Sequence, residues 1–240
     1  MIRTKIVEHR EGSTVLESQL VWDDATSGRR PTVLVVPEWY GINKFTIGRC
    51  ETLAKLGYAA FAVDVYGKGI RPAAFADAQS TSKPYYDDRA LLRRRGYSGL
   101  EACRAQDVVD ARKVAGIGYC FGGITLLELA RDGADLAGVV CFHTQLMTSM
   151  PAKEGAVKSK ILVLHGAYDP VVPQPEIDDF MKEMRAAKAD WQMMYYGNAV
   201  HSYTNPDWPP DPTHAKATAY NEVVDRRSWR LSCDFLAEVL

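Results

Sequence analysis

The segment GIGYCFGGITLLELA, residues 116–130, contains a cysteine between a predicted strand and a predicted helix. Cys120 stands between Gly118 and Gly122 in the pattern G-x-C-x-G, and a nucleophile in such a tight turn is presented at the carboxyl end of a sheet. The positive end of the following helix favours a thiolate. The pattern therefore predicts a nucleophilic thiol. The alternative is that Cys120 is a small buried filler, the commonest fate of a free cysteine.

A nucleophile in this kind of turn needs an acid and a base later in the chain, in the order Asp or Glu and then His. Asp169 follows the predicted strand KILVLHG (160–166), and His201 follows the predicted strand WQMMYYG (191–197). His201 can take the proton from Cys120 and return it to a leaving group, while Asp169 orients the ring. Their order and their places after strands predict a Cys–Asp–His triad.

Acyl transfer also needs hydrogen-bond donors for the negative charge that develops on the carbonyl oxygen. The backbone N–H of Phe121, directly after the nucleophile, is one predicted donor. The backbone N–H of Trp39, after the apolar run PTVLVVP (31–37), is the other. Glu38 precedes Trp39, and a carboxylate at the end of a buried strand is unusual enough to assign it to the site. The alternative for Glu38 is a solvated loop carboxylate.

The remaining histidines are weaker candidates. His143 ends a predicted strand and is expected to line the pocket, while His165 is expected to pack inside its strand. His9 and His214 are expected on the surface. The spacing of His143, His165 and His201 is not the i,i+4 spacing of helical metal ligands, and the five scattered cysteines form no CxxC pair. We therefore expect no metal site.

The elements that must position these residues alternate along the chain. Short apolar runs predict buried strands at residues 31–37, 58–67, 114–120, 137–143, 160–166 and 191–197, after an opening pair of strands at 5–9 and 14–22. Helical patterns are found at residues 45–57, 121–133, 175–189 and 213–239. Strands that alternate with helices predict an α/β fold, with a mainly parallel central sheet covered by helices on both faces.

Residues 70–112 are the least regular part of the chain, with proline, serine and aromatic residues before a helical portion. We expect an excursion or lid over the site here, followed by a helix. No internal repeat or low-complexity linker interrupts the order of elements, so residues 1–240 are expected to form a single domain.

Composition excludes several classes of protein. A hydrophobic content of 47%, a charged content of 25% and a net charge of -1 are ordinary for a globular chain. The basic run at residues 93–95 is too short to predict nucleic-acid binding and is expected on a solvated face. No long apolar segment predicts a membrane span or a signal peptide. We expect a cytoplasmic protein whose partner is a small molecule, with its oligomeric state left open.

Five segments together carry a family resemblance: VVPEWYGIN, GYAAFAVDVYGKG, GIGYCFGG, HGAYDPVVP and HSYTNP. Over residues 30–205 the chain resembles the dienelactone hydrolase family of α/β-hydrolases. The resemblance implies the α/β-hydrolase fold, no metal and no organic cofactor. It places the predicted triad on the family's Cys–Asp–His triad, and Trp39 and Phe121 on the oxyanion-hole amides. Glu38 falls on the glutamate that contacts and helps to activate the cysteine.

One position departs from the family pattern. Members that act on dienelactone bind its carboxylate with arginines, one of them four residues after the histidine, where this chain has Asn205. The other arginine falls within residues 71–95, where Arg71 and Arg89 are candidates. Loss of one charge-assisted contact costs about 1.5–3 kcal/mol, which argues against dienelactone itself. The residues expected to contact the substrate are Tyr40, Tyr85, Tyr86, His143, Tyr203, Asn205 and Trp208.

A thiolate attacks readily and leaves readily, so on an amide it would often depart before the poorer amine leaving group. We therefore expect hydrolysis of carboxylic esters or lactones through a thioester acyl-enzyme, with aryl esters and phosphotriesters as promiscuous substrates. Two alternatives stay open. One is a binding module that keeps the fold without turnover. The other is a thiol redox sensor in which Cys120 pairs with Cys141 or Cys50.

Overall fold

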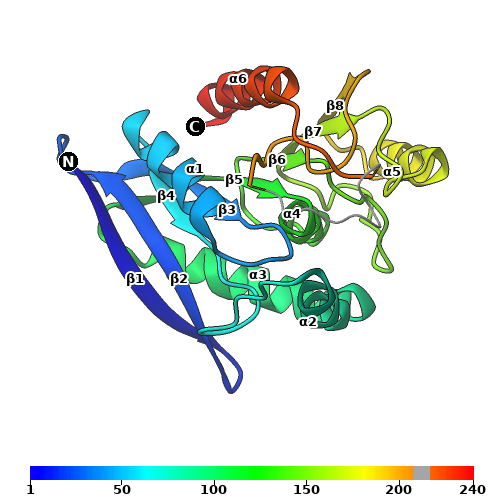
Figure 1. The fold of residues 1–240 in the computed structure, drawn as a ribbon. Coiled ribbons are helices and arrows are strands. Elements are labelled where there is room, and N and C mark those ends of the chain that lie inside the picture. The colour runs from blue at the N-terminus through cyan, green and yellow to red at the C-terminus, as the bar shows by residue number, and fades with distance from the viewer. Residues whose placement is uncertain (208–216) are drawn as a thin grey trace.

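The computed structural model describes residues 1–207 and 217–240. Figure 1 shows a twisted central sheet with helices on both of its faces. The strands are β1 (Ile2–Glu11), β2 (Thr14–Asp23), β3 (Arg30–Val36), β4 (Ala59–Ala62), β5 (Val109–Tyr119), β6 (Gly138–Phe142), β7 (Lys160–Gly166) and β8 (Trp191–Tyr196). The helices are α1 (Lys44–Lys55), α2 (Phe75–Asp87), α3 (Arg89–Arg104), α4 (Phe121–Arg131), α5 (Gln174–Ala186) and α6 (Glu222–Val239).

The sheet has eight strands in the order β1-β2-β4-β3-β5-β6-β7-β8. β1 pairs antiparallel with β2 and β2 with β4, whereas β4, β3 and β5 to β8 run parallel to their neighbours. The predicted α/β fold with a mainly parallel sheet is therefore confirmed. Because the parallel strands share a direction, their carboxyl ends meet along one edge of the sheet, and the loops that follow β3, β5, β6, β7 and β8 converge there.

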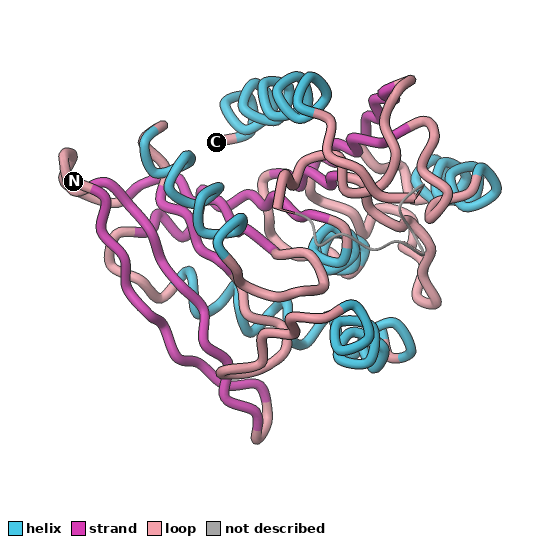
Figure 2. The backbone as a smooth tube through the Cα atoms, viewed as in Figure 1, coloured by secondary structure: helices cyan, strands magenta, loops and turns pink. Residues whose placement is uncertain are grey.

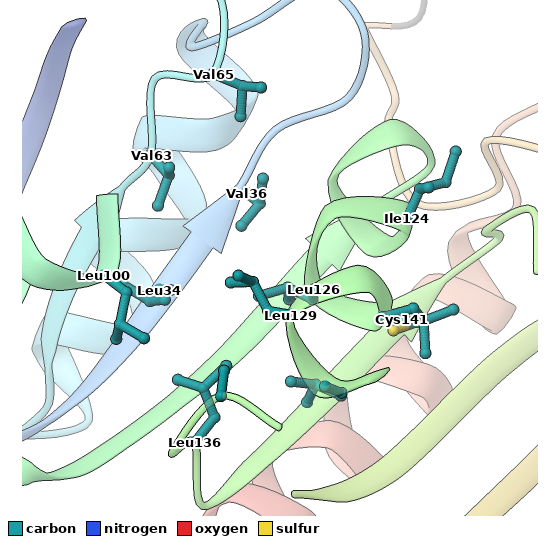
Figure 3. Packing of buried hydrophobic residues seen from close by; sticks show 14 of the residues in the cluster. Leu34, Val36, Val63, Val65, Leu100, Ile124, Leu126, Leu129, Leu136 and Cys141 are labelled. Atoms are coloured by element: carbon teal, nitrogen blue, oxygen red, sulfur yellow. The ribbon is translucent and has the colours of Figure 1, made fainter. Parts of the chain in front are cut away.

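Figure 2 shows the helices on the two sides of the sheet, and two clusters of buried hydrophobic residues lie between these helices and the sheet. Leu53 of α1 and Leu236 of α6 belong to one cluster. The other cluster takes residues from α2, α3, α4 and α5, and Figure 3 shows Leu126 and Leu129 of α4 packing over the sheet. Each fully buried leucine contributes about 1.5–3 kcal/mol, so both helical layers are held by apolar burial. The two helical layers hold the sheet in place, and with it the edge from which the loops extend.

Some predicted boundaries were wrong. The apolar run 58–67 ends as a strand at Ala62, because Asp64 accepts the backbone N–H groups of Tyr66 and Gly67 and turns the chain. The last helix begins at Glu222 rather than at 213, because the side chain of Asn221 accepts the N–H of Val224 as an N-cap. Residues 213–216 of that prediction lie outside the described residues.

The segment 70–112 is more regular than its composition indicated, since it forms α2 and α3 and then enters β5 at Val109. The basic run was expected on a solvated face, and of its three residues only Arg94 is exposed. Arg93 and Arg95 are 8% and 7% exposed. His9, expected on the surface, is half-buried and hydrogen-bonds Ser98 and Ser18, 2.7 and 2.9 Å away.

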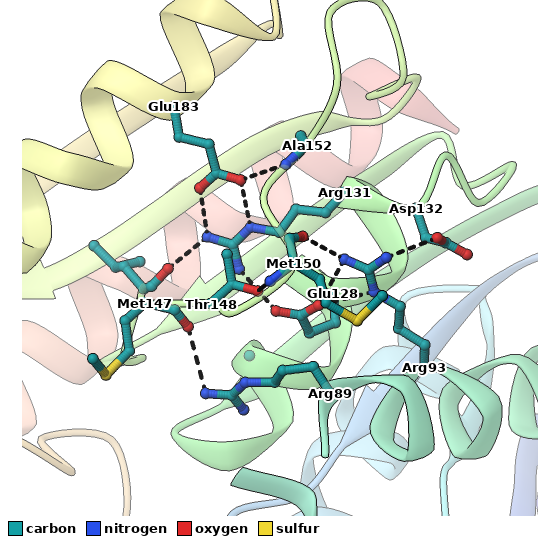
Figure 4. A network of polar contacts seen from close by, with 12 residues as sticks. Arg89, Arg93, Glu128, Arg131, Asp132, Met147, Thr148, Met150, Ala152 and Glu183 are labelled. Atoms are coloured by element: carbon teal, nitrogen blue, oxygen red, sulfur yellow. Dashed lines mark hydrogen bonds and ion pairs between the residues drawn. The ribbon is translucent and has the colours of Figure 1, made fainter. Parts of the chain in front are cut away.

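A buried ion network holds α3, α4 and α5 together (Figure 4). Glu128 of α4 accepts from Arg93 of α3 at 2.9 Å and from Arg131 at 3.3 Å. Arg131 in turn makes two hydrogen bonds of 2.9 Å to Glu183 of α5. The charge that each arginine buries is thus matched by a carboxylate, as burial requires.

Within the described part of the chain, no helix combines the length and apolarity needed to cross a membrane.

Candidate active site

Cys120 occupies a strained turn between β5 and α4, with φ 50° and ψ -112°. A non-glycine residue with positive φ is held there only by its surroundings. The two flanking positions must be glycine, because a side chain there would have no room. A Cβ on Gly118 would lie 2.4 Å from the carbonyl oxygen of Gly122, and a Cβ on Gly122 would lie 2.1 Å from that of Val36. The turn is thus built from close backbone approach, with Cys120 at its apex.

His201 lies between Cys120 and Asp169, although 81 and 32 residues separate it from them in the chain. Its Nε2 is 3.1 Å from Sγ of Cys120, and its Nδ1 is 2.7 Å from Oδ2 of Asp169. The other carboxylate oxygen of Asp169 accepts the backbone N–H of Val171 at 2.8 Å. The loops after β5, β7 and β8 thus bring a thiol, an imidazole and a carboxylate together.

The surroundings of His201 favour the protonated form of its ring. Burial lowers the pKa of His201, but the adjacent Cys120 and Asp169 outweigh burial and hold its pKa well above the usual value. The ring therefore has two acceptors, one at each nitrogen, that favour its protonated form. An imidazolium in this place can pair with a thiolate on one side and a carboxylate on the other.

Glu38 is 1% exposed and is not a solvated loop carboxylate. Its Oε2 accepts the side-chain N–H of Asn205 at 2.7 Å, while its Oε1 is buried with no hydrogen-bond partner among the described residues. Burial raises the pKa of Glu38 to about 7, although Asn205 and His201 act in the opposite direction. Within residues 1–207 and 217–240, no hydrogen bond joins Glu38 to Cys120, so here the glutamate is held by Asn205.

A cavity of about 630 Å³ opens onto Cys120 and His201. One of its walls is α2, which belongs to the predicted excursion at 70–112. Phe75 and Trp39 meet edge to face in the lining, with ring centroids 4.8 Å apart. The described residues that line the cavity are Trp39, Phe75, Ala76, Gln79, Ser80, Ser82, Lys83, Tyr86, Cys120, Gln145, Val171, His201, Ala217 and Thr218.

Sequence reasoning missed most of this lining. The positions 75, 79, 82, 83 and 86 follow helical spacing, so the amphipathic pattern of α2 was the available signal. Gln145 and Val171 sit in loops without a motif, and nothing in the sequence singled them out.

The residues expected to contact the substrate fall into several places. Tyr86 lines the main cavity. Tyr40 and Asn205 line a second cavity of about 510 Å³, together with Arg71. Tyr85 lines neither, since its ring is buried and its hydroxyl donates to the carbonyl of Tyr66 at 3.4 Å.

His143 and Tyr203, also expected in the pocket, are fully buried and line neither cavity. The ring of His143 instead packs against the rings of His201 and Tyr203, and the hydroxyl of Tyr203 donates to the carbonyl of Leu164 at 2.9 Å. Arg89, a candidate for carboxylate binding, is also buried and stacks over Tyr86 at 5.4 Å. Trp208 lies outside the described residues.

The two predicted oxyanion donors have different settings. Phe121 is the first residue of α4, where backbone N–H groups have no partner inside the helix. Trp39 follows β3, and its carbonyl accepts the hydroxyl of Tyr66 at 2.9 Å. Among the described residues, no group of three or more His, Cys, Asp or Glu side chains is arranged to hold a metal ion.

Residues 18–240 match the model of the dienelactone hydrolase family. The chain belongs to the dienelactone hydrolase family. Its relatives include an uncharacterized protein of Caenorhabditis elegans, 31% identical over 155 residues that cover 63% of this chain and 96% of that one. A Salmonella typhimurium protein provisionally named carboxymethylenebutenolidase is 25% identical, over 89% of this chain and 79% of its own length.

Solved structures agree with this membership. A dienelactone hydrolase-like promiscuous phosphotriesterase from metagenomic libraries is 41% identical, with a TM-score of 0.93 over 99% of this chain and 98% of that chain. An α/β hydrolase from a Medee basin deep-sea metagenome library shares the fold, with 19% identity and a TM-score of 0.61 over 98% of both chains. This dienelactone hydrolase family member is thus a hydrolase with the α/β-hydrolase fold, as the sequence resemblance predicted.

Proposed function

We propose that this hydrolase cleaves carboxylic esters or lactones with Cys120 as nucleophile, His201 as general base and acid, and Asp169 as the group that orients His201. One observation carries the proposal. His201 bridges Sγ of Cys120 and Oδ2 of Asp169, at 3.1 and 2.7 Å, beside a cavity that opens onto the sulfur.

The proposed reaction has two halves. The thiolate of Cys120 attacks the carbonyl carbon, a C–S bond forms, and the negative oxygen is held by the backbone N–H groups of Phe121 and Trp39. His201 then gives its proton to the leaving oxygen as the C–O bond breaks, which leaves a thioester. In the second half, His201 takes a proton from water, the water oxygen attacks the thioester, and the thiolate departs as the acid forms.

Glu38 is proposed to assist the deprotonation of Cys120 when a substrate enters. A pKa of about 7 lets this carboxylate accept a proton near neutral pH. The role requires Glu38 to leave its hydrogen bond with Asn205, and the buried, unpartnered Oε1 supports such a change of partner.

The cavity favours a neutral substrate with an aromatic or bulky apolar part. Trp39, Phe75 and Tyr86 supply three aromatic walls, and Lys83, the one lysine or arginine among the described lining residues, is paired with Asp87. Asn205, where the family has a substrate-binding arginine, is hydrogen-bonded to Glu38. Dienelactone, which carries a carboxylate, is therefore not the proposed substrate.

Intact-protein mass spectrometry after mixing with 4-nitrophenyl butyrate tests the proposal. We expect one acyl adduct, mapped to Cys120, which accumulates in the wild type and is lost in Cys120→Ala and His201→Ala. Cys141→Ala is the matched control, because Cys141 is also buried, and its sulfur makes its one hydrogen bond among the described residues to the carbonyl of Gly123, at 3.7 Å. An adduct on another residue, or ester hydrolysis that survives Cys120→Ala, would contradict the assignment.

Phosphotriester hydrolysis is a second candidate activity. It is supported by the 41% identical structure described as a promiscuous phosphotriesterase. The same oxyanion donors can stabilise charge on a phosphoryl oxygen. A comparison of wild type and Cys120→Ala on an aryl phosphotriester tests this, and equal rates would exclude it.

The redox-sensor alternative receives little support. All five cysteines are free thiols, and burial raises the pKa of Cys141 to about 12, which makes it a poor partner for an oxidised Cys120. The mass spectrometry experiment also separates the remaining alternatives. A disulfide or sulfenic acid without acylation would favour a sensor, and no covalent change at all would favour a binding module.

A further inference from the structure

His143 is a buried histidine that the proposed reaction does not use. It directly follows β6, with φ 39°, and its side chain is 0% exposed. Burial, and then the neighbouring His201, lower the pKa of His143 well below its usual value. The ring is therefore neutral, and it lies outside the residues that line the substrate cavity.

The order of strands explains where His143 lies. β6 stands between β5, which leads to Cys120, and β7, which leads to Asp169. The backbone N–H of Cys120 donates to the carbonyl of Phe142 at 3.0 Å, and that of His143 donates to the carbonyl of Leu164 at 2.9 Å. His143 is thus fixed by its backbone between the nucleophile and the acid.

The ring of His143 supports the loop that carries His201. The two imidazole centroids are 5.2 Å apart, with planes at 67°. Nε2 of His143 is 2.8 Å from the hydroxyl of Thr204, three residues beyond His201, whereas Nδ1 has no hydrogen-bond partner in the described chain. The Thr204 hydroxyl is therefore the one polar anchor of this ring among the described residues.

The same loop has further attachments. The carbonyl of Thr204 accepts from Arg49 at 3.2 Å, and Asn205 donates to Glu38. These contacts hold the end of the loop. The hydrogen bond from His143 reaches the same residue, Thr204, three positions after His201. Ser202 has φ 55°, so the loop is held in a conformation that its own residues do not favour.

We propose that His143 is a positioning residue, which through its hydrogen bond to Thr204 keeps the His201 ring within reach of the Cys120 sulfur. This inference rests on the proposed function of Cys120 and His201. It assigns His143 a role through His201 and none in contact with the substrate.

The groups that face the two rings must stay unchanged in a test of this role. His143 faces His201, Arg49 and His165. His201 faces Cys120, Asp169, Glu38, His143 and His165. A substitution at Thr204 replaces none of these groups, so the variants test the position of the His201 ring.

Thr204→Val removes the hydroxyl and nearly keeps the shape, and Thr204→Ser is the matched control that keeps the hydroxyl. The first measurement is the pH midpoint for alkylation of Cys120 by iodoacetamide, followed on its own peptide by mass spectrometry. In Thr204→Val we expect this midpoint to rise by about half a pH unit or more, because the thiolate loses a well-placed imidazolium. Thr204→Ser is expected to keep the wild-type midpoint.

The second measurement is the hydrolysis of 4-nitrophenyl butyrate. In Thr204→Val we expect kcat to fall about tenfold, with KM within about twofold, because the affected ring positions a reacting group rather than the substrate. His143→Phe, which keeps an aromatic ring and loses the hydrogen bond, is expected to behave like Thr204→Val, and it serves if that variant does not fold.

A lower melting temperature in Thr204→Val with an unchanged midpoint and kcat would show that the contact only packs, and would overturn the inference. Equal changes in Thr204→Val and Thr204→Ser would also overturn it, because the hydroxyl would then not be responsible. Alkylation needs no ester turnover. A wild type that fails to hydrolyse esters therefore contradicts the proposed function, while the midpoint still decides the role of His143.

Discussion

The two ends of α4 bury polar groups in opposite ways. At its carboxyl end, both oxygens of Glu128 accept from arginines, Arg93 and Arg131, and Arg131 is also paired with Glu183 (Figure 4). At its amino end, the backbone of Cys120 is strained, and near it Oε1 of Glu38 and Nδ1 of His143 have no hydrogen-bond partner among the described residues.

The two ends of α4 therefore differ in how completely their buried polar groups are paired. A buried group without a partner costs about 1–3 kcal/mol, so such groups are rare unless a site needs them. In the network Arg93 and Arg131 are each paired with carboxylates, and Arg131 also donates to the carbonyl of Leu146 and Arg93 to that of Met150. These bonds hold the loop that presents Gln145 to the cavity.

Removal of the proposed nucleophile, Cys120, gives the largest expected effect and changes only the amino end of α4. Cys120→Ala should lower kcat/KM for an aryl ester by at least about a thousandfold, because no other group replaces the thiolate. The free energy of unfolding, from urea denaturation, should stay within about 1 kcal/mol of wild type. Residual activity within tenfold of wild type would show that Cys120, at the amino end of α4, is not the nucleophile.

A change at the carboxyl end of α4 should lower stability and leave activity nearly unchanged. Glu128→Ala leaves Arg93 and Arg131 buried without their shared carboxylate, and we expect a loss of about 3–5 kcal/mol of stability. The kcat of the folded fraction should change little. Asp132→Ala is the matched control: Asp132 pairs with the same Arg93, but its side chain is 42% exposed, so it should cost less than about 1 kcal/mol. Similar losses in both variants would argue against a special role for burial.

Glu38 allows a test of stability against pH. Its pKa in the folded protein is about 7, above its ordinary 4.5, so its contribution to stability is fully present below pH 4.5 and is lost as pH rises through 7. Glu38→Gln should therefore be the more stable protein near pH 8.5, by up to about 3 kcal/mol, and this difference should vanish at low pH. A stability difference that does not change with pH would contradict the raised pKa.

The smallest effect is expected at Asn205. Asn205→Ala removes the hydrogen bond that lowers the pKa of Glu38, so that pKa should rise further and the acidic limb of the kcat/KM profile should move to higher pH. The rate near neutral pH should change by less than about tenfold, since one neutral donor is lost. Asn198→Ala, at an exposed asparagine three residues before His201, is the control and should leave the profile unchanged.

The sequence alone determined the α/β fold, the turn at Cys120 and the order of the three candidate residues. These features depend on local signals. Apolar runs mark the buried strands, and Gly118 and Gly122 sit where a Cβ would meet backbone atoms. Asp169 and His201 directly follow strands whose carboxyl ends must meet if the sheet is parallel, so their convergence could be inferred without coordinates.

Only the tertiary structure decided what surrounds them. Arg93 looked like part of a solvated basic run, but the packing of α3 against α4 buries it against Glu128. Asn205 was expected to contact the substrate, and the fold instead places it 2.7 Å from Glu38, which is 167 residues away in the chain. His143 was expected in the pocket, but its ring packs against that of His201 and lines neither cavity. Such contacts join loops from different strands, so no local pattern in the sequence encodes them.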